Sequence, residues 1–326
     1  MSHTIDLRYL EEAAIALRAG KLVAIPTETV YGLAADATQE TAVTNIFRLK
    51  GRPSFNPLIT HFATSQEAFS HVIASPTARK LAQEFWPGPL TLVLEKSPQS
   101  NLAPSISAGL STIAVRVPSH PIALAILSQT QRPLAAPSAN PSEGLSPTCA
   151  QHVNDAFQGN PLLHMIIDGG ACTQGLESTV VSVTDEIVTL LRPGSLAREE
   201  IEAFLGTPLK TPTHTGITSP GQMLRHYAPK KAHIRLNASD VKEGEALLAF
   251  GPTTLTAPLM RNLSTNANLQ EAAQNLFVML HELDQAGAHI IAVMPLPDTH
   301  VGTALNARLI RASRPPLDPG LYEFHA

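Results

Sequence analysis

Residues 22–33 read LVAIPTETVYGL, an apolar run that ends at a proline and continues into hydroxyl-bearing side chains. The uncharged run 22–25 followed by a turn signal predicts a short buried strand. Thr27, Thr29 and Tyr31 then bring two hydroxyls and a phenol to the end of this strand. Ligands of open α/β sheets bind at the carboxyl ends of strands. We therefore expect a polar binding site directly after this strand.

A helix is predicted next, at residues 41–50, where apolar side chains recur at helical spacing up to Gly51. Glycine is suited to the left-handed conformation that ends many helices. Lys50 and Arg52 flank this end. Side chains two positions apart on a continuous helix point apart, but a break at Gly51 can turn both cations toward one anion. The alternative is a solvated pair of cations at a helix end, which the macrodipole favours.

Size and composition restrict the class of protein. The 326 residues are enough for two domains with separate cores, and 44% hydrophobic with 15% charged residues is typical of globular chains. The apolar runs are too short for a membrane helix and the first residues lack a signal-peptide pattern, so we expect a soluble cytoplasmic protein. A net charge of −4 argues against a broad nucleic-acid surface. The cysteine and histidine spacings predict no zinc site or disulfide framework.

Strand-like and helical patterns are mixed up to residue 205, which favours a mixed sheet over strict β-α-β alternation. The predicted strands are 22–25, 58–62, 90–94, 113–117, 165–167, 180–183 and 187–191. The predicted helices are 7–19, 41–50, 66–73, 77–85, 121–128, 149–157 and 198–204. Prolines among Gly, Ser and Thr then predict a linker at 206–231. The last part, with strands at 233–236, 246–250 and 289–294 and helices at 269–286 and 304–312, has the order of a parallel α/β domain.

Two further segments carry candidate chemistry. Arg116 interrupts the apolar run 113–117, and a buried unpaired charge is costly. One possible partner is a ligand carboxylate, in a contact worth about 1.5–3 kcal/mol. The alternatives are a structural ion pair and a strand face that is exposed to solvent. Residues 136–140, APSAN, are small enough for backbone amides to approach a phosphate closely. Neither a P-loop nor a GxGxxG fingerprint is present.

In order and spacing, these blocks resemble the Sua5/YrdC/YciO family, whose members make threonylcarbamoyl-adenylate for tRNA modification. The blocks that carry the resemblance are 25–33, 50–58, 111–118, 136–140, 177–180, 191–194 and 219–229. The resemblance implies an α/β chain with a mixed, twisted, open-sheet domain of the YrdC type at 1–205. An extended linker at 206–231 would join it to a smaller Rossmann-like α/β domain of the Sua5 type at 232–326.

The resemblance also implies a function, that of a nucleotidyltransferase. It would join L-threonine, bicarbonate or CO2 and ATP into L-threonylcarbamoyl-adenylate and release pyrophosphate, for N6-threonylcarbamoyladenosine at position 37 of tRNAs. The implied threonine-binding positions are Thr29, His61, Arg116, Ala136 and Ser178. The implied ATP-binding positions are Lys50, Arg52, Asn56, Thr112, Ser138, Ser146, Arg192 and Tyr227, with Lys50 and Arg52 as catalytic residues.

Cofactor and partners follow from the same resemblance. Mg2+ is expected with the triphosphate, without a dedicated set of protein ligands in the sequence. The expected partners are the proteins that transfer the threonylcarbamoyl group to tRNA downstream. tRNA is a further candidate for contact, and no membrane contact is expected.

Several of these positions have structural alternatives. His61 could be an ordinary strand-end histidine, Asn56 a turn residue and Arg192 a surface residue of a hairpin. Residues 222–224 depart from the family's usual Met-Lys-Tyr, which leaves Tyr227 as the linker's better candidate. The competing functions are a double-stranded RNA or tRNA-binding module without nucleotide turnover, and a serine hydrolase. The acidic balance counts against the first, and the missing G-x-S-x-G elbow counts against the second.

Overall fold

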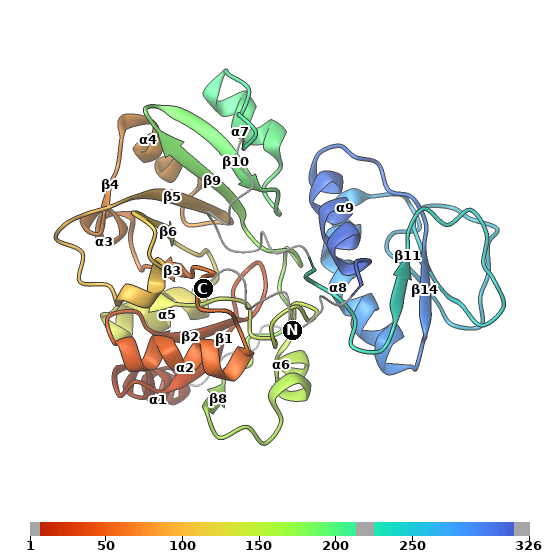
Figure 1. Cartoon of the computed structure of the whole chain (residues 1–326), viewed down its shortest axis with the longest axis horizontal. Coiled ribbons are helices and arrows are strands. Elements are labelled where there is room, and N and C mark those ends of the chain that lie inside the picture. Colours follow the sequence, from red (N-terminus) through yellow and green to blue (C-terminus); the bar gives the residue numbers. More distant parts are fainter. Residues whose placement is uncertain (1–6, 213–224, 316–326) are drawn as a thin grey trace. The chain divides into compact units, whose positions relative to one another are not determined.

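The structure is a computed structural model that describes residues 7–212 and 225–315 (Figure 1). Its contacts divide this part of the chain into unit 1, residues 7–142 and 146–212, and unit 2, residues 143–145 and 225–315. Residues 213–224, which make up much of the predicted linker, lie outside the described residues. The domain boundaries at 205 and 231 therefore stay predictions. Within the described ranges, no helix has both the length and the apolar character needed to cross a membrane.

Unit 1 is built around one mixed sheet. Its strands are β1 (Leu22–Ile25), β2 (Gly32–Asp36), β3 (Ile59–His61), β4 (Val72–Ile73), β5 (Leu90–Lys96), β6 (Thr112–Arg116), β7 (Leu134–Ala135), β8 (Leu163–Ile166), β9 (Thr179–Thr184) and β10 (Ile187–Arg192). They follow the order β10-β9-β5-β6-β3-β7-β2-β1-β8, with β4 beside β5. Strand β3 is parallel to β6, whereas β5 is antiparallel to β6, so the predicted mixed open sheet is confirmed.

Helices pack on both faces of this sheet (Figure 1). They are α1 (Leu7–Arg18), α2 (Glu40–Lys50), α3 (Ser65–Ser70), α4 (Pro76–Phe85), α5 (Pro121–Thr130), α6 (Ala150–Phe157) and α7 (Arg198–Leu205), with a short 3-10 helix η1 (Pro104–Ile106). Apolar residues of α1 and α5 form one core cluster with β1, β2 and β7. Apolar residues of α2, α3, α4, α6 and α7 form the larger cluster on the other face.

A third, small cluster contains no helix residue. It consists of Ile59, Val93, Ala114 and Val180 from β3, β5, β6 and β9, which we call the sheet-face patch. These side chains lie in adjacent strands, with Ile59 and Val93 each paired across from Ala114. The patch therefore marks a stretch of the sheet where strands, and not helices of unit 1, supply the neighbours.

Local signals explain the elements that the sequence predicted, and their absence explains those it missed. Helix α2 ends at Gly51, which has φ 59° as expected for a left-handed cap. The helix predicted at 66–73 is too long, because α3 ends at Ser70 and Val72–Ile73 pair with β5 instead. β-Branched residues favour strands over helix ends. Strand β2, with the sequence GLAAD, lacks such residues and is held by its pairing to β1 and β7.

Unit 2 is a smaller α/β unit with a wholly parallel sheet. Its strands β11 (His233–Arg235), β12 (Ala246–Ala249), β13 (Met260–Asn262) and β14 (Ile290–Val293) follow the order β11-β14-β12-β13. Helices α8 (Leu269–Gln285) and α9 (Val301–Ala312) pack against each other. The Asn268 side chain caps α8 by accepting from the amides of Gln270 and Glu271. The predicted small Rossmann-like α/β domain is thus confirmed as a parallel α/β unit.

Candidate functional site

Several predicted site residues share the face of the sheet that carries the sheet-face patch. Cross-strand partners lie on one face, as do residues two apart in a strand. His61 pairs with Arg116 across β3 and β6, and Arg192 pairs with Val180 of the patch. Thr112 and Arg116 lie two residues before and after Ala114 of the patch, and Thr112 is half-buried at the start of the strand. The sheet therefore presents two guanidinium groups, an imidazole and a hydroxyl on one surface.

Arg116 is 3% exposed and almost fully bonded. Its Nη2 donates to Oε1 of Glu28 at 2.5 Å, and Nη1 and Nη2 each donate to Oγ1 of Thr29 at 3.1 Å. Its Nε donates to the Gly88 carbonyl at 3.1 Å. A guanidinium has five N–H donors, so one Nη1 hydrogen is left without an acceptor among the described residues. The structure thus gives Arg116 an ion-pair partner and leaves one donor for a ligand.

The hydroxyl protons of the loop after β1 can be assigned from its acceptors. Oγ1 of Thr27 lies 2.6 Å from the Val30 carbonyl, which can only accept, so the single Thr27 proton points there. In the 2.8 Å contact between Thr27 and Thr29, Thr29 is therefore the donor. The lone pairs of Thr29 then face the two Arg116 nitrogens. The loop and Arg116 form one ordered network.

A second network joins the strands on the other side of the patch. Oγ of Ser178 lies 2.8 Å from Oγ1 of Thr91, and Nη2 of Arg192 donates to the Ser178 carbonyl at 2.8 Å and to Oγ at 3.1 Å. Arg192 is 4% exposed, so the alternative of a surface arginine is wrong. A Cβ on Gly194 would lie 2.4 Å from the Ser178 carbonyl carbon, so only glycine allows this approach. Among the described residues, the hydrogen-bond partners of the Ser178 hydroxyl are Thr91 and Arg192 and not a histidine, which argues against a serine hydrolase.

His61 is a buried histidine beside this network. Burial, and after it the charge of Arg116, lowers the pKa of His61 to about 3. Hydrogen bonding to the backbone at Ile59 and Leu134 opposes this lowering but is the smaller effect. Nδ1 itself is buried and meets no partner at full hydrogen-bond geometry among the described residues. The imidazole is therefore neutral at physiological pH.

The two cations around Gly51 turn to different acceptors. Nζ of Lys50 donates to the carbonyls of Ser138, at 2.5 Å, and Asn140. Arg52 donates from Nη2 to Oδ1 of Asn56 at 2.7 Å and to the Pro57 carbonyl at 2.8 Å. Each cation thus orders its own loop. That the helix break turns both toward one anion stays a prediction.

Burial changes the character of this helix end. Lys50 is 4% and Arg52 9% exposed, so a solvated cationic pair is wrong. Burial, and after it the Arg52 charge, lowers the pKa of Lys50. Two of the three Lys50 donors are bonded to carbonyls, and the third has no acceptor among the described residues. This end of α2 is a fixed, desolvated pair of cations.

The remaining predicted residues differ in their placement. The Ala136 amide donates to the Ile59 carbonyl at 3.1 Å, which ties the loop after β7 to the sheet-face patch. Oγ of Ser146 donates to Oε1 of Glu177, next to Ser178. Tyr227 belongs to unit 2, where it is 1% exposed and packs against Phe277 and Arg308, and its hydroxyl has no partner among the described residues.

Three buried polar residues of these networks were missed as site residues by sequence reasoning. Glu28 lies within the quoted motif, and its signal was an acidic residue in an otherwise uncharged loop. Glu177 directly precedes Ser178, and it carried the same signal. Thr91 lies in an apolar strand, where threonine is common, so nothing in the sequence distinguished it.

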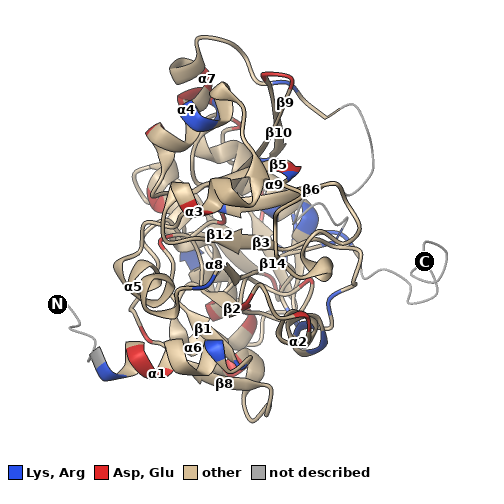
Figure 2. Cartoon of the chain, turned by 90° about the vertical axis from the view of Figure 1, so that its left-hand side faces the viewer, with Lys and Arg blue, Asp and Glu red and all other residues tan. Residues whose placement is uncertain are grey.

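Charge and metal ligands are sparse elsewhere in the described chain. Figure 2 shows Lys and Arg scattered over unit 1 between long stretches of other residues. Among residues 7–212 and 225–315, no group of three or more His, Cys, Asp or Glu side chains could hold a metal ion.

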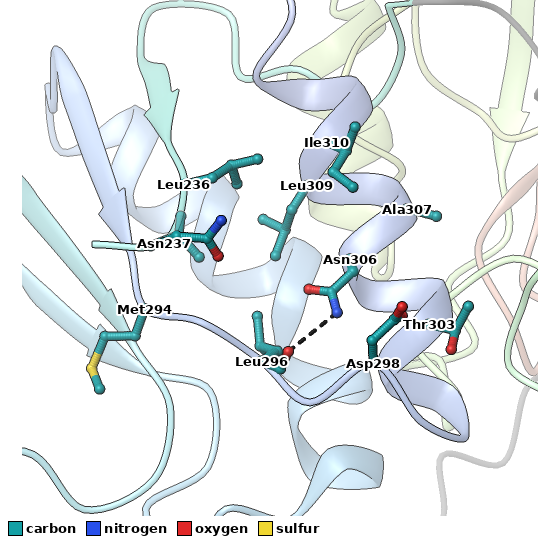
Figure 3. Close-up of a pocket in the computed structure, with 11 residues that line it drawn as sticks. Leu236, Asn237, Met294, Leu296, Asp298, Thr303, Asn306, Ala307, Leu309 and Ile310 are labelled. Atoms are coloured by element: carbon teal, nitrogen blue, oxygen red, sulfur yellow. Dashed lines mark hydrogen bonds between the residues drawn. The ribbon is translucent and has the colours of Figure 1, made fainter. Parts of the chain in front are cut away.

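A separate cavity of about 410 Å3 lies in unit 2, between α9 and the ends of β11 and β14 (Figure 3). Its polar lining comes from Asn237, Asp298, Thr303 and Asn306, and Asn306 donates to the Leu296 carbonyl at 3.2 Å. Among the described residues that line this cavity there is no Lys or Arg and none of the predicted site residues.

Comparison with known proteins covers both parts of the chain. Residues 15–194 match the Sua5/YciO/YrdC family model described as telomere recombination, and residues 196–314 match the model described as threonylcarbamoyl-AMP synthase, C-terminal domain. The threonylcarbamoyl-AMP synthase of Pyrococcus abyssi is 41% identical over 92% of this chain and 93% of its own length. The Bacillus subtilis protein of the same name is 38% identical over 93% and 92%.

A solved structure agrees with these relatives. The crystal structure of P. abyssi Sua5 complexed with L-threonine has a TM-score of 0.87, with 39% identity over 95% of this chain and 96% of that one. The relatives bear the name of a synthase, so the RNA-binding alternative finds no support in them. By its family models, its full-length relatives and its fold, this chain belongs to the Sua5/YrdC/YciO family.

Proposed function

We propose that the chain is an ATP-dependent L-threonylcarbamoyl-adenylate synthase. The threonine amine adds to CO2 to give a carbamate, whose oxygen attacks the α-phosphorus of ATP, and pyrophosphate leaves. The observation that carries the proposal is the near-full-length similarity to proteins of this name, one of which is solved with L-threonine. The product would serve the formation of N6-threonylcarbamoyladenosine in tRNA.

The networks of unit 1 suit this reaction because it needs no covalent nucleophile. A polyanionic triphosphate has to approach an anionic carbamate, and fixed donors in a dry site reduce the repulsion. Lys50 and Arg52 are proposed to hold the phosphates, since their positions are fixed by carbonyl acceptors before any ligand binds. Asn56, Thr112, Ser138, Ser146, Arg192 and Tyr227 are proposed as further ATP contacts.

The amino acid is proposed to bind where the loop after β1 meets β3 and β6. The remaining Nη1 hydrogen of Arg116 would donate to the threonine carboxylate. His61, neutral and buried, would contact the polar part of the substrate. Thr29, Ala136 and Ser178 complete the proposed set.

Mg2+ is proposed only as the counter-ion of ATP. The described residues offer no carboxylate cluster for it, so the triphosphate and water would supply its ligands. The acyl-adenylate is a reactive anhydride, and proteins that transfer its acyl group to tRNA are the proposed downstream partners. A cytoplasmic location stays a prediction of the sequence.

Pyrophosphate release tests the proposal directly. The purified chain with ATP, L-threonine and bicarbonate should release pyrophosphate and form a product with the mass of the adenylate. Release that does not depend on threonine would contradict the assignment. Removal of Mg2+ should abolish turnover, and Mg2+ added back in step with ATP should restore it.

Lys50→Met separates turnover from folding. The substitution removes the charge and leaves two carbonyls without their donor, which costs about 1–3 kcal/mol of stability. It should lower pyrophosphate release by at least about 100-fold. Full turnover in a folded Lys50→Met protein would remove Lys50 from the phosphate site.

A further inference from the structure

The carboxylate of Glu28 is buried in the candidate site and bonded at both oxygens. It is 4% exposed, and its Oε1 accepts from Nη2 of Arg116 at 2.5 Å. Its Oε2 accepts from the Ser119 amide at 3.1 Å, and its own carbonyl accepts from the Gln174 amide at 2.8 Å. Glu28 thus joins the loop after β1 to β6 and to the segments that contain Ser119 and Gln174.

Both Glu28 oxygens are engaged by donors of the protein. Oε1 receives an N–H of Arg116 and Oε2 the Ser119 amide. A general base has to reach the proton that it removes, whereas these oxygens are buried against a cation and an amide. The geometry therefore argues against Glu28 as the base that deprotonates the substrate amine.

The effect of Glu28 falls instead on the orientation of Arg116. Three fixed acceptors, on Glu28, Thr29 and Gly88, take four of the five guanidinium hydrogens. A planar guanidinium held at these points cannot rotate, so the direction of its fifth hydrogen is set before a ligand arrives. Glu28 supplies the only charge among the three acceptors, and hydrogen bonds to charged groups are the strong ones.

We propose that Glu28 is a positioning residue for the amino-acid substrate, which holds Arg116 so that its remaining Nη1 hydrogen meets the substrate carboxylate. The inference rests on the proposed function and adds to it a residue outside the set that the family resemblance implies. Glu28 also neutralises the charge of the buried guanidinium. The substrate carboxylate is therefore bound mainly by the oriented Nη1 hydrogen of Arg116 and less by a net positive charge.

Glu28→Gln is the variant that tests this role. The amide keeps the shape of the side chain but has one acceptor and one donor end, so either Arg116 or the Ser119 amide meets a donor. The orientation of Arg116 should loosen, and KM for threonine should rise at least about 10-fold. KM for ATP and kcat should change less than about 3-fold, because the triphosphate contacts and the reacting atoms are untouched.

Unit 2 provides a matched control in Glu245. Its Oε2 accepts from Nη2 of Arg235 at 2.5 Å and from the Lys242 amide at 2.9 Å, and Glu245 is 5% exposed. Glu245→Gln should reproduce the loss of stability expected from breaking a carboxylate that joins a guanidinium to an amide. It should leave KM for threonine unchanged, which separates positioning from a general loss of stability.

A double-mutant cycle with Arg116→Lys tests whether Glu28 acts through Arg116. Lysine lacks the planar guanidinium group that Glu28 orients. In the Arg116→Lys protein, Glu28→Gln should therefore raise KM for threonine by less than about 2-fold. If the effects of the two substitutions on KM for threonine multiply, the proposal is overturned. A fall in kcat at unchanged KM for threonine, which is the result expected of a base, would overturn it too.

Threonine binding measured by calorimetry keeps this inference separate from the proposed function. If the unmodified chain binds threonine but releases no pyrophosphate, the proposed function fails, and weaker binding by Glu28→Gln still supports the positioning role. If the unmodified chain turns over and Glu28→Gln binds threonine equally well, the positioning role fails alone.

Discussion

Among the described residues, each unit of the molecule has a buried carboxylate bonded to an arginine, and the two arginines differ in their exposure. In unit 2, Arg235 donates to both Glu245 oxygens and also to the side chain and carbonyl of Asp240. In unit 1, Arg116 donates to Glu28, Thr29 and the Gly88 carbonyl, so each guanidinium uses four of its five hydrogens and keeps one on Nη1. The exposed fractions of the Arg235 and Arg116 side chains are 28% and 4%. The remaining hydrogen of the more exposed arginine can meet water, whereas a remaining donor in the interior is typical of a binding site.

The largest expected effect comes from removing the arginine of each pair. Arg116→Met leaves Glu28 as a buried charge without its cation, which costs about 3–5 kcal/mol. Arg235→Met also leaves a buried carboxylate, but its cation is more than a quarter exposed, so water can replace part of the lost bonds and the cost should be smaller, about 1–2 kcal/mol. Urea unfolding followed by circular dichroism measures both. Equal losses in the two variants would mean that burial does not distinguish the pairs.

A smaller effect is expected from acid, through His61. Its pKa is lowered from 6.5 to about 3. Between these pH values the unfolded chain therefore binds a proton at His61 and the folded chain does not. This contribution to stability is complete above pH 6.5 and is lost as the pH falls. Between pH 6.5 and pH 4 the loss amounts to roughly 3 kcal/mol.

His61→Asn should flatten this acid dependence of unfolding, measured by urea titrations at several pH values. His233→Asn, at an exposed strand position of unit 2, is the control and should leave the dependence as it is. A His61→Asn protein that loses stability with acid as steeply as the parent would show that the imidazole is not the group responsible.

The smallest expected effect concerns the helix ends. Gly51 and Gly206 both end a helix of unit 1 with positive φ, 59° and 69°, and a Cβ at either would meet open space. Alanine at either position should therefore cost only about 1 kcal/mol, from the left-handed backbone alone. Gly51 lies between Lys50 and Arg52, so Gly51→Ala should also lower pyrophosphate release, and Gly206→Ala should not. Equal pyrophosphate release by the two variants would show that the end of α2 does not contribute to the phosphate site.

The elements that sequence patterns could predict are those with a local cause. Strand β1 and helix α2 were predicted within a residue of their bounds, because an apolar run before a proline and a helical repeat before a glycine are complete signals. Strand β2 has neither β-branched nor aromatic residues and exists through its two neighbours. Strand β13 similarly was missed, as its residues Met260–Asn262 carry no strand pattern.

The site was accessible to sequence reasoning only through the order of its motifs. Which residue binds which depends on contacts between distant positions, such as Glu28 with Arg116, 88 residues apart. The carbonyl acceptors of Lys50 likewise come from a loop that follows β7, and a main-chain oxygen leaves no trace in residue types. The burial of Arg192 was unpredictable for the same reason, since its neighbour Ser178 lies 14 residues earlier, directly before β9.

The strand order of unit 1 has a consequence for how the chain is made. β1 lies beside β8, and β5 lies between β6 and β9. These early strands can therefore complete their pairing only after much later residues have been translated. A ribosome has to release residues up to Arg192 before the second guanidinium of the sheet face can take its place. Pairing across such separations is slow, and nascent β1 and β5 edges stay exposed during synthesis. Unit 2, whose sheet is contained within 233–293, closes over a much shorter length of newly made polypeptide.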